Sequence, residues 1–535
     1  MEAQAHPLTR TRGEGLAPLT AELLQRASAA LDAKDPHAAE APLAEVLAVA
    51  PRCAEALRLQ GLLWHLRGDF AAAVTSLEQA HALWPEDPLI QMNLATARYA
   101  CGDHDVALSS LQRVCAMAPA FAPGWYNLGK MFMLKGRPTG AVTALYRALD
   151  VEPGHLPARM LLAQAQAGLG AAGPASESYR AVLRLEPEQP SAWVGLADLN
   201  AAPFSTEDLA QLQHALQAPH VDAGGRICLG FALTRALEDQ ADYRGAFHAL
   251  RKANGLMQRQ LGWNAGRASA WAQAVCQHFA EPICLARNDI PASPQLIFII
   301  GMPQAGSLLT AQILANHADV AIADEPSVLE KVIDAESIRR QQPFPQWTAT
   351  ASPADWSRLG QQYLIGIEPL RQGKPCFVDR TPGHWRLVGA LLAMLPGALV
   401  VDSRRGALET CFACYRQLFI SGHEFSYDLD HVASYWRDYD RLSQHWQHLF
   451  PEHLLVHEYE TWQAEAEPSV RRLLDFCGLR FEHACVEVHG TQGIKRDTSR
   501  VATEELMRRD SLRCTAYDKQ LEHLRALLRA RPVAR

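Results

Sequence analysis

Two glycines and a serine outline a loop of the kind that binds phosphate groups. Gly301 and Gly306 are separated by four residues, and Ser307 follows at once, in the segment LIFIIGMPQAGSLLTAQ. Glycines let the backbone turn so that several N–H groups face one anion, and a hydroxyl adds a further donor. Ser307 stands where a nucleoside-triphosphate-binding loop has its lysine. The loop therefore favours phosphate-group chemistry other than that of a kinase or an ATPase.

The elements around this loop have the geometry that phosphate binding needs. Leu296 to Ile300 is a short apolar run, typical of a buried parallel strand, and a helical pattern begins at Ser307. The first turn of that helix directs its free N–H groups and its dipole at a bound anion. Further along the chain we expect strands at 376–378, 399–402 and 454–457, and helices around 384–395, 408–420 and 467–476. This alternation predicts a parallel sheet with helices on both faces.

The segments at these strands resemble one known family. GMPQAGSLLTAQILANHADV is similar to the first loop of the bacterial tetratricopeptide-repeat sulfotransferases, whose catalytic half is similar to the tyrosylprotein sulfotransferases. CFVDRTPGHWR resembles the family's D-K-x-P element, LVVDSRRGALETCFACYRQLF its R-R-D-P-x-D-x-x-x-S segment, and HLLVHEYETW its later strand. The resemblance covers roughly residues 294–490. It implies 3′-phosphoadenosine 5′-phosphosulfate as the donor, no metal, and transfer of the sulfuryl group to a hydroxyl or amine of a peptide or small acceptor.

The same resemblance assigns roles to individual residues. The positions implied to hold the donor are Pro303, Gln304, Gly306, Ser307, Leu308, Arg405 and Ala413. Arg405 and Ala413 match the family's ligands for the 3′-phosphate, and the others lie in the loop for the 5′-phosphosulfate. Glu325 matches the general base, which must take up the acceptor's proton as sulfur arrives. Arg380 matches the cation of D-K-x-P, which holds a sulfuryl oxygen.

Several of these positions depart from the family pattern. The family has a cation where this chain has Gln304, a serine where it has Ala305 and a threonine where it has Leu308. It also has an aspartate where this chain has Gly406 and a serine where it has Ala413. Losing a charge-assisted contact to an anion costs about 1.5–3 kcal/mol. Two functions therefore stay open. One is a sulfotransferase with an altered donor site, and the other is a catalytically impaired relative that keeps the fold as a protein-interaction module.

Simpler structural roles are available for the same residues. Glu325 fits a solvated acid at a helix start, Arg380 an ion pair with Asp379 or a neighbour, and Arg405 a surface salt bridge. Cys411 and Cys414 share one face of a predicted helix, which favours buried thiols over a redox or metal site. The basic residues between 495 and 513 form either a solvated helix or a lid over the donor's phosphates.

The first half of the chain repeats with a period of 34 residues. The period is marked by Pro51, Pro85, Pro119, Pro153 and Pro187, and by Gly68, Gly102, Gly136 and Gly170. Small residues such as Gly61 and Gly129 recur where two helices must approach closely, and Trp125 and Trp193 share an aromatic position. This pattern resembles the tetratricopeptide repeat over about 54–200, after a degenerate repeat with Lys34 at the glycine position. Such repeats act either as scaffold or as a surface that binds a protein or peptide.

These patterns predict an all-α solenoid followed by an α/β domain. We expect tetratricopeptide repeats over 1–204, a helical extension or linker over 205–290, and a sulfotransferase-like domain over 291–535. The 51 basic and 58 acidic residues give a net charge of −7, which argues against a nucleic-acid partner. No apolar run is long enough for a membrane span or a signal peptide. Twelve scattered cysteines fit a reduced compartment, so we expect a cytoplasmic protein.

Overall fold

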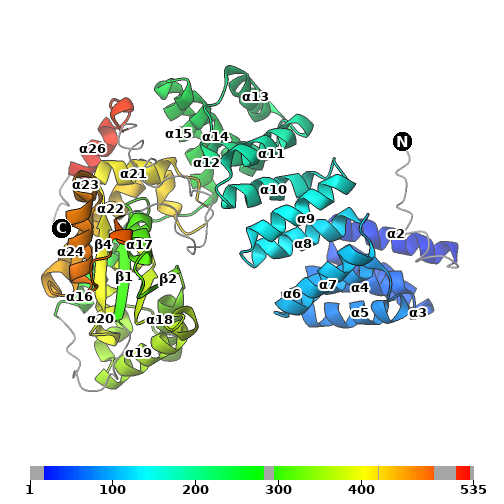
Figure 1. Ribbon diagram of the computed structural model, residues 1–535, viewed down its shortest axis with the longest axis horizontal. Helices are drawn as coiled ribbons and strands as arrows, with labels where there is room; N and C mark the ends of the chain where they lie inside the picture. Colours follow the sequence, from blue (N-terminus) through cyan, green and yellow to red (C-terminus); the bar gives the residue numbers. More distant parts are fainter. Residues whose placement is uncertain (1–16, 282–294, 420, 487–513, 530–535) are drawn as a thin grey trace. The chain divides into compact units, whose positions relative to one another are not determined.

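The computed structural model of the protein describes residues 17–281, 295–419, 421–486 and 514–529. Contacts divide the chain into two compact units, Met1–Pro187 and Glu188–Arg535, and Figure 1 shows the elements of each. The end of the predicted helical extension or linker, from residue 282 on, and the basic segment at 495–513 lie outside the described residues.

The first unit consists of antiparallel helix pairs, as the 34-residue period predicts. Its helices are α2 (Pro18–Asp32), α3 (Pro36–Val49), α4 (Ala54–Leu66), α5 (Phe70–Leu83), α6 (Pro88–Ala100), α7 (His104–Met117), α8 (Ala122–Leu134), α9 (Pro138–Val151), α10 (Leu156–Gly168) and α11 (Ala172–Leu185). The recurring prolines follow the second helix of each pair by two residues. Because proline cannot continue a helix, it starts the turn into the next pair.

The recurring glycines occupy the turn inside each pair. Gly68 and Gly136 have φ values of +80° and +66°, a left-handed conformation that glycine adopts without strain. Lys34 takes the same conformation, with φ +58°, in the first pair. At the small position, a Cβ on Gly129 would lie 2.7 Å from Cγ of Leu145, so only a glycine lets α8 and α9 approach this closely.

The second unit begins with a run of helices, the last three of which pack on the α/β domain. They are α12 (Pro190–Leu199), α13 (Thr206–Gln217), α14 (Ala223–Asp239), α15 (Tyr243–Gln260) and α16 (Ala265–His278). Leu250 of α15 and Phe279 belong to the same buried cluster as strand residues such as Phe298. Asn254 of α15 donates a buried hydrogen bond of 2.9 Å to the carbonyl of Tyr415. Helices α14 to α16 and Phe279 therefore share one core with the sheet.

A five-stranded parallel sheet forms the centre of the second unit. Its strands are β1 (Gln295–Gly301), β2 (Val320–Asp324), β3 (Cys376–Arg380), β4 (Leu399–Arg404) and β5 (Leu454–Glu458). Their order is β2-β3-β1-β4-β5, and all neighbouring pairs are parallel. Four of these strands are at the predicted positions, while β2 carried no sequence signal that we used. The order of the strands reverses beside β1, and ligands bind at such switch points of α/β sheets.

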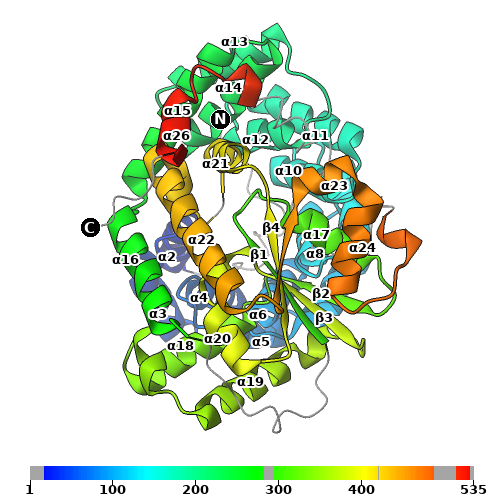
Figure 2. The ribbon, with the colours of Figure 1, turned by 90° about the vertical axis from the view of Figure 1, so that its left-hand side faces the viewer.

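Helices cover both faces of the sheet, as Figure 2 shows. One face packs against α17 (Ser307–Ala315), α23 (Tyr459–Ala464) and α24 (Ala466–Phe476). The other face packs against α16, α19 (Pro353–Ile367), α20 (Val388–Met394), α21 (Ala407–Arg416) and α22 (Leu429–Leu449). The remaining described helices are α18 (Val328–Arg340), α26 (Glu522–Arg529) and the short η1 (Gln346–Thr350), η2 (Glu368–Leu370), η3 (Pro382–Arg386), η4 (Glu424–Tyr427) and η5 (His483–Cys485).

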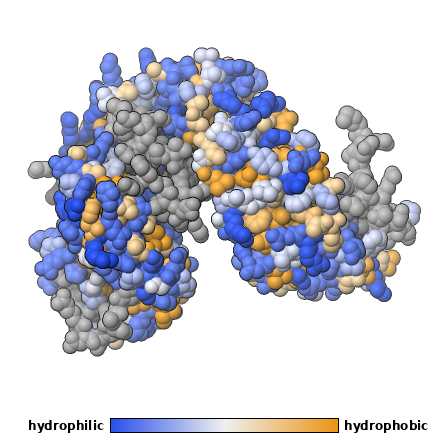
Figure 3. All heavy atoms as spheres, in the orientation of Figure 1, coloured by the Kyte–Doolittle hydropathy of each residue, from blue (hydrophilic) through white to orange (hydrophobic). Residues whose placement is uncertain are grey.

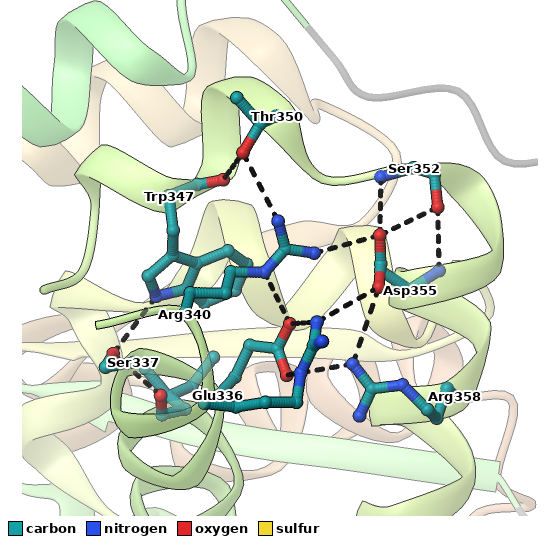
Figure 4. A network of polar contacts seen from close by, with 10 residues as sticks. Glu336, Ser337, Arg340, Trp347, Thr350, Ser352, Asp355 and Arg358 are labelled. Atoms are coloured by element: carbon teal, nitrogen blue, oxygen red, sulfur yellow. Dashed lines mark hydrogen bonds and ion pairs between the residues drawn. The ribbon is translucent and has the colours of Figure 1, made fainter. Parts of the chain in front are cut away.

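A buried glutamate fixes α18 to α19 and η1. Glu336 is 1% exposed and accepts hydrogen bonds from Arg339, Arg340 and Arg358, as drawn in Figure 4. These guanidinium groups, Arg339 above all, lower the pKa of Glu336 to about 2. Asp355, which caps α19, pairs with the same arginines. The two helices are therefore held rigidly relative to each other.

No helix in the described ranges combines the length and the apolar character that crossing a bilayer requires.

Candidate functional site

The sheet brings the predicted site residues to one edge. In parallel strands the carboxyl ends lie together, and a predicted residue or motif lies at the carboxyl end of four of the five strands. Glu325 follows β2, Arg380 ends β3, the glycine loop follows β1, and Arg405 follows β4. Ala413 lies farther along α21, where Cys414 approaches the loop, with its Sγ 3.2 Å from the carbonyl oxygen of Pro303. Every predicted position therefore lies at or beside the carboxyl edge of the sheet.

The loop after β1 has the backbone geometry that its glycines predict. Gly301 and Gly306 have φ values of +147° and +103°, and a Cβ on Gly301 would lie 2.5 Å from the carbonyl oxygen of Ser403. Gln304, also left-handed at φ +64°, is exposed. Ala305 is buried. The first turn of α17 starts directly after Gly306, so its N–H groups face the space at this edge of the sheet.

Arg380 joins this loop to the end of β3. Its Nη1 donates to Oγ of Ser307 over 3.3 Å, and its Nη2 forms an ion pair with Asp324 at the end of β2. Nε of Arg380 is buried without a hydrogen-bond partner among the described residues. Asp379 lies on the opposite face of the sheet, because successive side chains of a strand alternate. The partner of Arg380 is therefore Asp324.

Arg405 lies beside a surface that is more acidic than the sequence suggested. It is 6% exposed, and its guanidinium lies 5.5 Å from the ring centre of Tyr459. The N–H of Gly406 donates to Oε1 of Glu460 over 2.9 Å. A side chain at position 406 would collide with Oε2 of Glu409. Two carboxylates thus lie at the start of α21, next to the arginine implied for the 3′-phosphate.

A chain of buried polar groups fixes the phosphate-loop helix to the sheet. Oγ1 of Thr310 lies 2.9 Å from Oγ of Ser403 and 3.1 Å from Nδ1 of His457. Nε2 of His457 lies 3.2 Å from Oγ of Ser469 on α24. Burial lowers the pKa of His457 to about 4, so the imidazole is neutral at physiological pH. This series of polar contacts connects α17, β4, β5 and α24.

A second polar network lies under the same edge, on the other face of the sheet. Asp379 is fully buried and accepts hydrogen bonds from Tyr363 (2.8 Å) and Thr381 (2.7 Å). Nδ1 of His384 lies 3.7 Å from Oδ1 of Asp379, and its Nε2 lies 2.9 Å from Oε1 of Glu330. Burial raises the pKa of Asp379. Burial also disfavours the charge on Glu330, but the contact with His384 keeps the pKa of this carboxyl below its ordinary value.

The sequence interpretation missed the members of this second network. Asp379 and His384 both lie in the segment that resembles D-K-x-P, and their adjacency to Arg380 was the available signal. Glu330 and Tyr363 come from helices that the sequence interpretation did not assign, so no motif pointed to them. Glu325 itself is exposed, and its N–H donates to the carbonyl of Arg380 over 3.0 Å.

Cys411 and Cys414 are buried thiols. Burial raises the pKa of both well above the ordinary value, so neither thiol ionises readily. Across the described ranges, no group of three or more His, Cys, Asp or Glu side chains is arranged to hold a metal ion.

Comparison with known proteins assigns both parts of the chain. Residues 294–483 match the model of the sulfotransferase family, and residues 24–88 and 92–157 match that of the tetratricopeptide repeat. An uncharacterized protein of Aquifex aeolicus (strain VF5) is 28% identical over 382 residues, which are 69% of this chain and 50% of that protein. The small glutamine-rich tetratricopeptide repeat-containing protein 2 of Mycosarcoma maydis is 28% identical over 102 residues, 19% of this chain and 29% of that protein. The chain thus spans half or less of these relatives.

Solved structures similar to this chain include tetratricopeptide-repeat proteins. One, from Parabacteroides merdae, is 18% identical and covers 46% of this chain and 95% of its own, with a TM-score of 0.32. Another, from Thermus thermophilus, is 25% identical and covers 34% of this chain and 98% of its own, with a TM-score of 0.28. From the family matches, the chain combines tetratricopeptide repeats with a domain that belongs to the sulfotransferase family.

Proposed function

We propose that this protein transfers a sulfuryl group from 3′-phosphoadenosine 5′-phosphosulfate to a hydroxyl or amine of a peptide or small acceptor. The observation that carries the proposal is the contact between Ser307 and Arg380, because it combines a phosphate loop and a cation at one point. Like phosphoryl transfer, sulfuryl transfer needs little covalent help from a protein. Positioning and positive charge at the moving group supply most of the rate.

The residues at the edge can divide this work. The first turn of α17, with the hydroxyl of Ser307, offers donors to the 5′-phosphosulfate. Pro303, Gln304, Gly306 and Leu308 shape the loop around it. Arg380 is held in place by Asp324, and its buried, unpartnered Nε fits an oxygen of the moving group. Arg405 and the α21 face that carries Ala413 remain the proposed contacts for the 3′-phosphate. Glu325 is the base that the family resemblance proposes.

Calorimetric titration with 3′-phosphoadenosine 5′-phosphate tests the donor site directly. The full-length protein should bind this product saturably, and Arg405→Ala should weaken binding about ten- to hundredfold, since a charge-assisted contact is worth roughly 1.5–3 kcal/mol. The matched control is Arg371→Ala, because Arg371 precedes β3 at the opposite edge of the sheet. Absence of binding at millimolar nucleotide contradicts the proposal.

A second function is favoured by one specific observation. Glu409 and Glu460 surround Gly406 at the start of α21, and carboxylates repel a phosphate. Together with the neutral Gln304, they support the alternative that the domain is a catalytically impaired protein-interaction module. In that case the titration gives no heat with any adenine nucleotide, while the protein remains folded.

We further propose that the repeats recruit a protein or peptide. Apolar side chains gather over α8 to α10 in the view of Figure 3. The exposed large hydrophobic residues of α8, α9 and the end of α10 are Leu134 (55%), Tyr146 (49%), Val151 (39%) and Leu169 (37%). Exposed apolar surface of this kind supports protein binding. Leu134→Glu should therefore reduce sulfation of a protein acceptor and leave the nucleotide titration unchanged.

A further inference from the structure

The network of Glu330, His384 and Asp379 has the form of a proton-accepting site. A carboxylate lies at each end, at 2.9 Å and 3.7 Å from the two nitrogens of one imidazole. The inner end is closed, because Asp379 and His384 are 0% and 1% exposed. The outer end is open, because the side chain of Glu330 is 39% exposed. The network thus extends from the buried Asp379 through His384 to the partly exposed side chain of Glu330.

The open end carries an unsatisfied acceptor atom. Oε1 of Glu330 contacts His384, but Oε2 is buried and has no hydrogen-bond partner within the described ranges. Leaving a buried polar atom unpaired disfavours folding, so water, an ion or a ligand completes such an atom. The atom that completes a carboxylate oxygen is an O–H or N–H donor. An acceptor hydroxyl or amine is such a donor.

The position of the network fits a role beside the phosphate loop. Asp379 immediately precedes Arg380, which contacts Ser307, and β3 pairs directly with β1. Glu330 lies in the first turn of α18, which begins soon after β2 ends at the same edge. The network therefore occupies the carboxyl edge, on the face opposite α17.

The surrounding structure holds the network rigidly. Tyr363 of α19 and Thr381 fix Asp379 through hydrogen bonds. The Glu336 cluster of Figure 4 ties the far end of α18 to α19 and η1. Among the described residues, Arg386 is a further charged group near Glu330, and it also lowers the pKa of this carboxyl. Catalytic groups need support of this kind to keep their geometry.

We propose that Glu330, in place of the Glu325 indicated by the family resemblance, is the catalytic base for the acceptor, with His384 and Asp379 as its positioning residues; this inference rests on the proposed function. As the acceptor oxygen or nitrogen bonds to sulfur, the bond from sulfur to the bridging oxygen of the nucleotide breaks. The nucleotide leaves with that electron pair, and the acceptor's proton passes to the carboxylate of Glu330, whose side chain is 39% exposed. His384 contacts the carboxylate of Glu330 and so positions it, and Asp379 lies behind the imidazole.

The test compares Glu330→Gln with Asp334→Asn, which changes an exposed carboxylate one turn later on α18. Release of 3′-phosphoadenosine 5′-phosphate from the donor is measured with tyramine, which offers both a phenol and an amine, and with water alone. Glu330→Gln should lower kcat by about 10²–10⁴-fold, the range for a lost general base. It should also remove the acidic limb of the pH–rate profile and leave nucleotide affinity unchanged. Asp334→Asn should match the wild type in kcat, in the pH–rate profile and in nucleotide affinity.

The failures of the two proposals are distinguishable. If the wild type does not bind 3′-phosphoadenosine 5′-phosphate, the proposed function fails, and the catalytic inference fails with it. If the nucleotide binds but Glu330→Gln releases product as fast as the wild type, only the inference is overturned. If Glu325→Gln lowers the rate of product release and Glu330→Gln does not, the inference is likewise overturned, and the base is Glu325.

Discussion

Glu409 and Glu460 give the start of α21 an acidic character that bears on donor choice. Glu460 accepts the N–H of Gly406, and Glu409 lies in the first turn of the helix. Helix N-termini favour negative charge, so Glu460 satisfies an N–H group that a phosphate otherwise binds. A 3′-phosphate must compete with Glu460 for this N–H group and must lie near the charge of both carboxylates.

Glu409→Gln should therefore tighten binding of 3′-phosphoadenosine 5′-phosphate by up to about tenfold, because one repelling charge is removed. Adenosine 5′-phosphate, which lacks the 3′-phosphate, serves as the control ligand and should bind the variant and the wild type equally. Calorimetry measures both. Equal gains for the two nucleotides would place the 3′-phosphate away from α21.

His457 makes the stability of the second unit depend on pH. Burial lowers its pKa to about 4 in the folded protein, while the unfolded chain has the ordinary value of 6.5. Below pH 6.5 the unfolded state therefore binds a proton that the folded state does not. Stability is fully present above pH 6.5 and falls as the pH drops towards 4.

Between pH 7 and pH 5 this residue alone should remove about 2 kcal/mol of unfolding free energy. Urea unfolding at the two pH values measures the loss. His457→Gln cannot titrate, so its stability should change by correspondingly less over the same interval. A variant with the same pH dependence as the wild type would show that other groups, such as the buried Asp379, dominate.

At the scale of elements, two tryptophans at one repeat position have different surroundings. Trp193 is fully buried. Trp125 is only partly buried, and its Nε1 donates to the carbonyl of Pro119 over 2.9 Å. The repeat pattern gives both tryptophans the same position, but the burial of each side chain depends on which residues of the neighbouring helices pack against it.

Trp193→Ala should cost about 3–5 kcal/mol because it leaves a large cavity. Trp125→Ala should cost clearly less, since part of that side chain already contacts solvent, and it serves as the matched variant. Chemical denaturation followed by circular dichroism gives both values. Equal losses would mean that Trp125 is buried as deeply as Trp193.

Elements differ in how strongly the sequence predicts them. The strands β1 and β4 are short apolar runs with β-branched residues, so their burial was readable. β2 has the sequence VAIAD and pairs only with β3 at the edge of the sheet. Two of its residues are alanine, and an edge strand needs less apolar surface. The helices α18, α19 and α22 were likewise not assigned, which left Glu330 and Tyr363 unrecognised.

At the scale of the whole molecule, helices α14 to α16 belong with the sheet. Leu250, Phe279 and Phe298 lie in one buried cluster. Arg416 of α21 forms an ion pair of 2.7 Å with Glu238 of α14, and Tyr517 donates to the same carboxylate. A fragment that begins after these helices loses both the apolar cover and the buried ion pair.

Expression of two fragments tests this arrangement. Residues 188–535 should be soluble and unfold cooperatively, because they keep the whole core. Residues 291–535 should aggregate, because the apolar side chains that contact α14 to α16 become exposed. A soluble, cooperatively folded 291–535 fragment would show that the helices are a separate layer.

The sequence by itself determined the periodic features of this protein. The 34-residue repeat, the strand–loop–helix motif at Gly301 and the alternation of strands and helices depend on local propensity and spacing, which are encoded over short stretches. The conformations of Gly301 and Gly306 follow from the same local rules.

Only the tertiary structure decided which side chains meet. Arg380 pairs with Asp324 because β2 and β3 are neighbours, and Asp379 points to the other face because strand side chains alternate. Glu330 reaches His384 from a helix more than fifty residues earlier in the chain. Such contacts depend on strand order and helix packing, which no local pattern specifies. The acidic surroundings of Arg405 arise in the same way, from residues on two different helices.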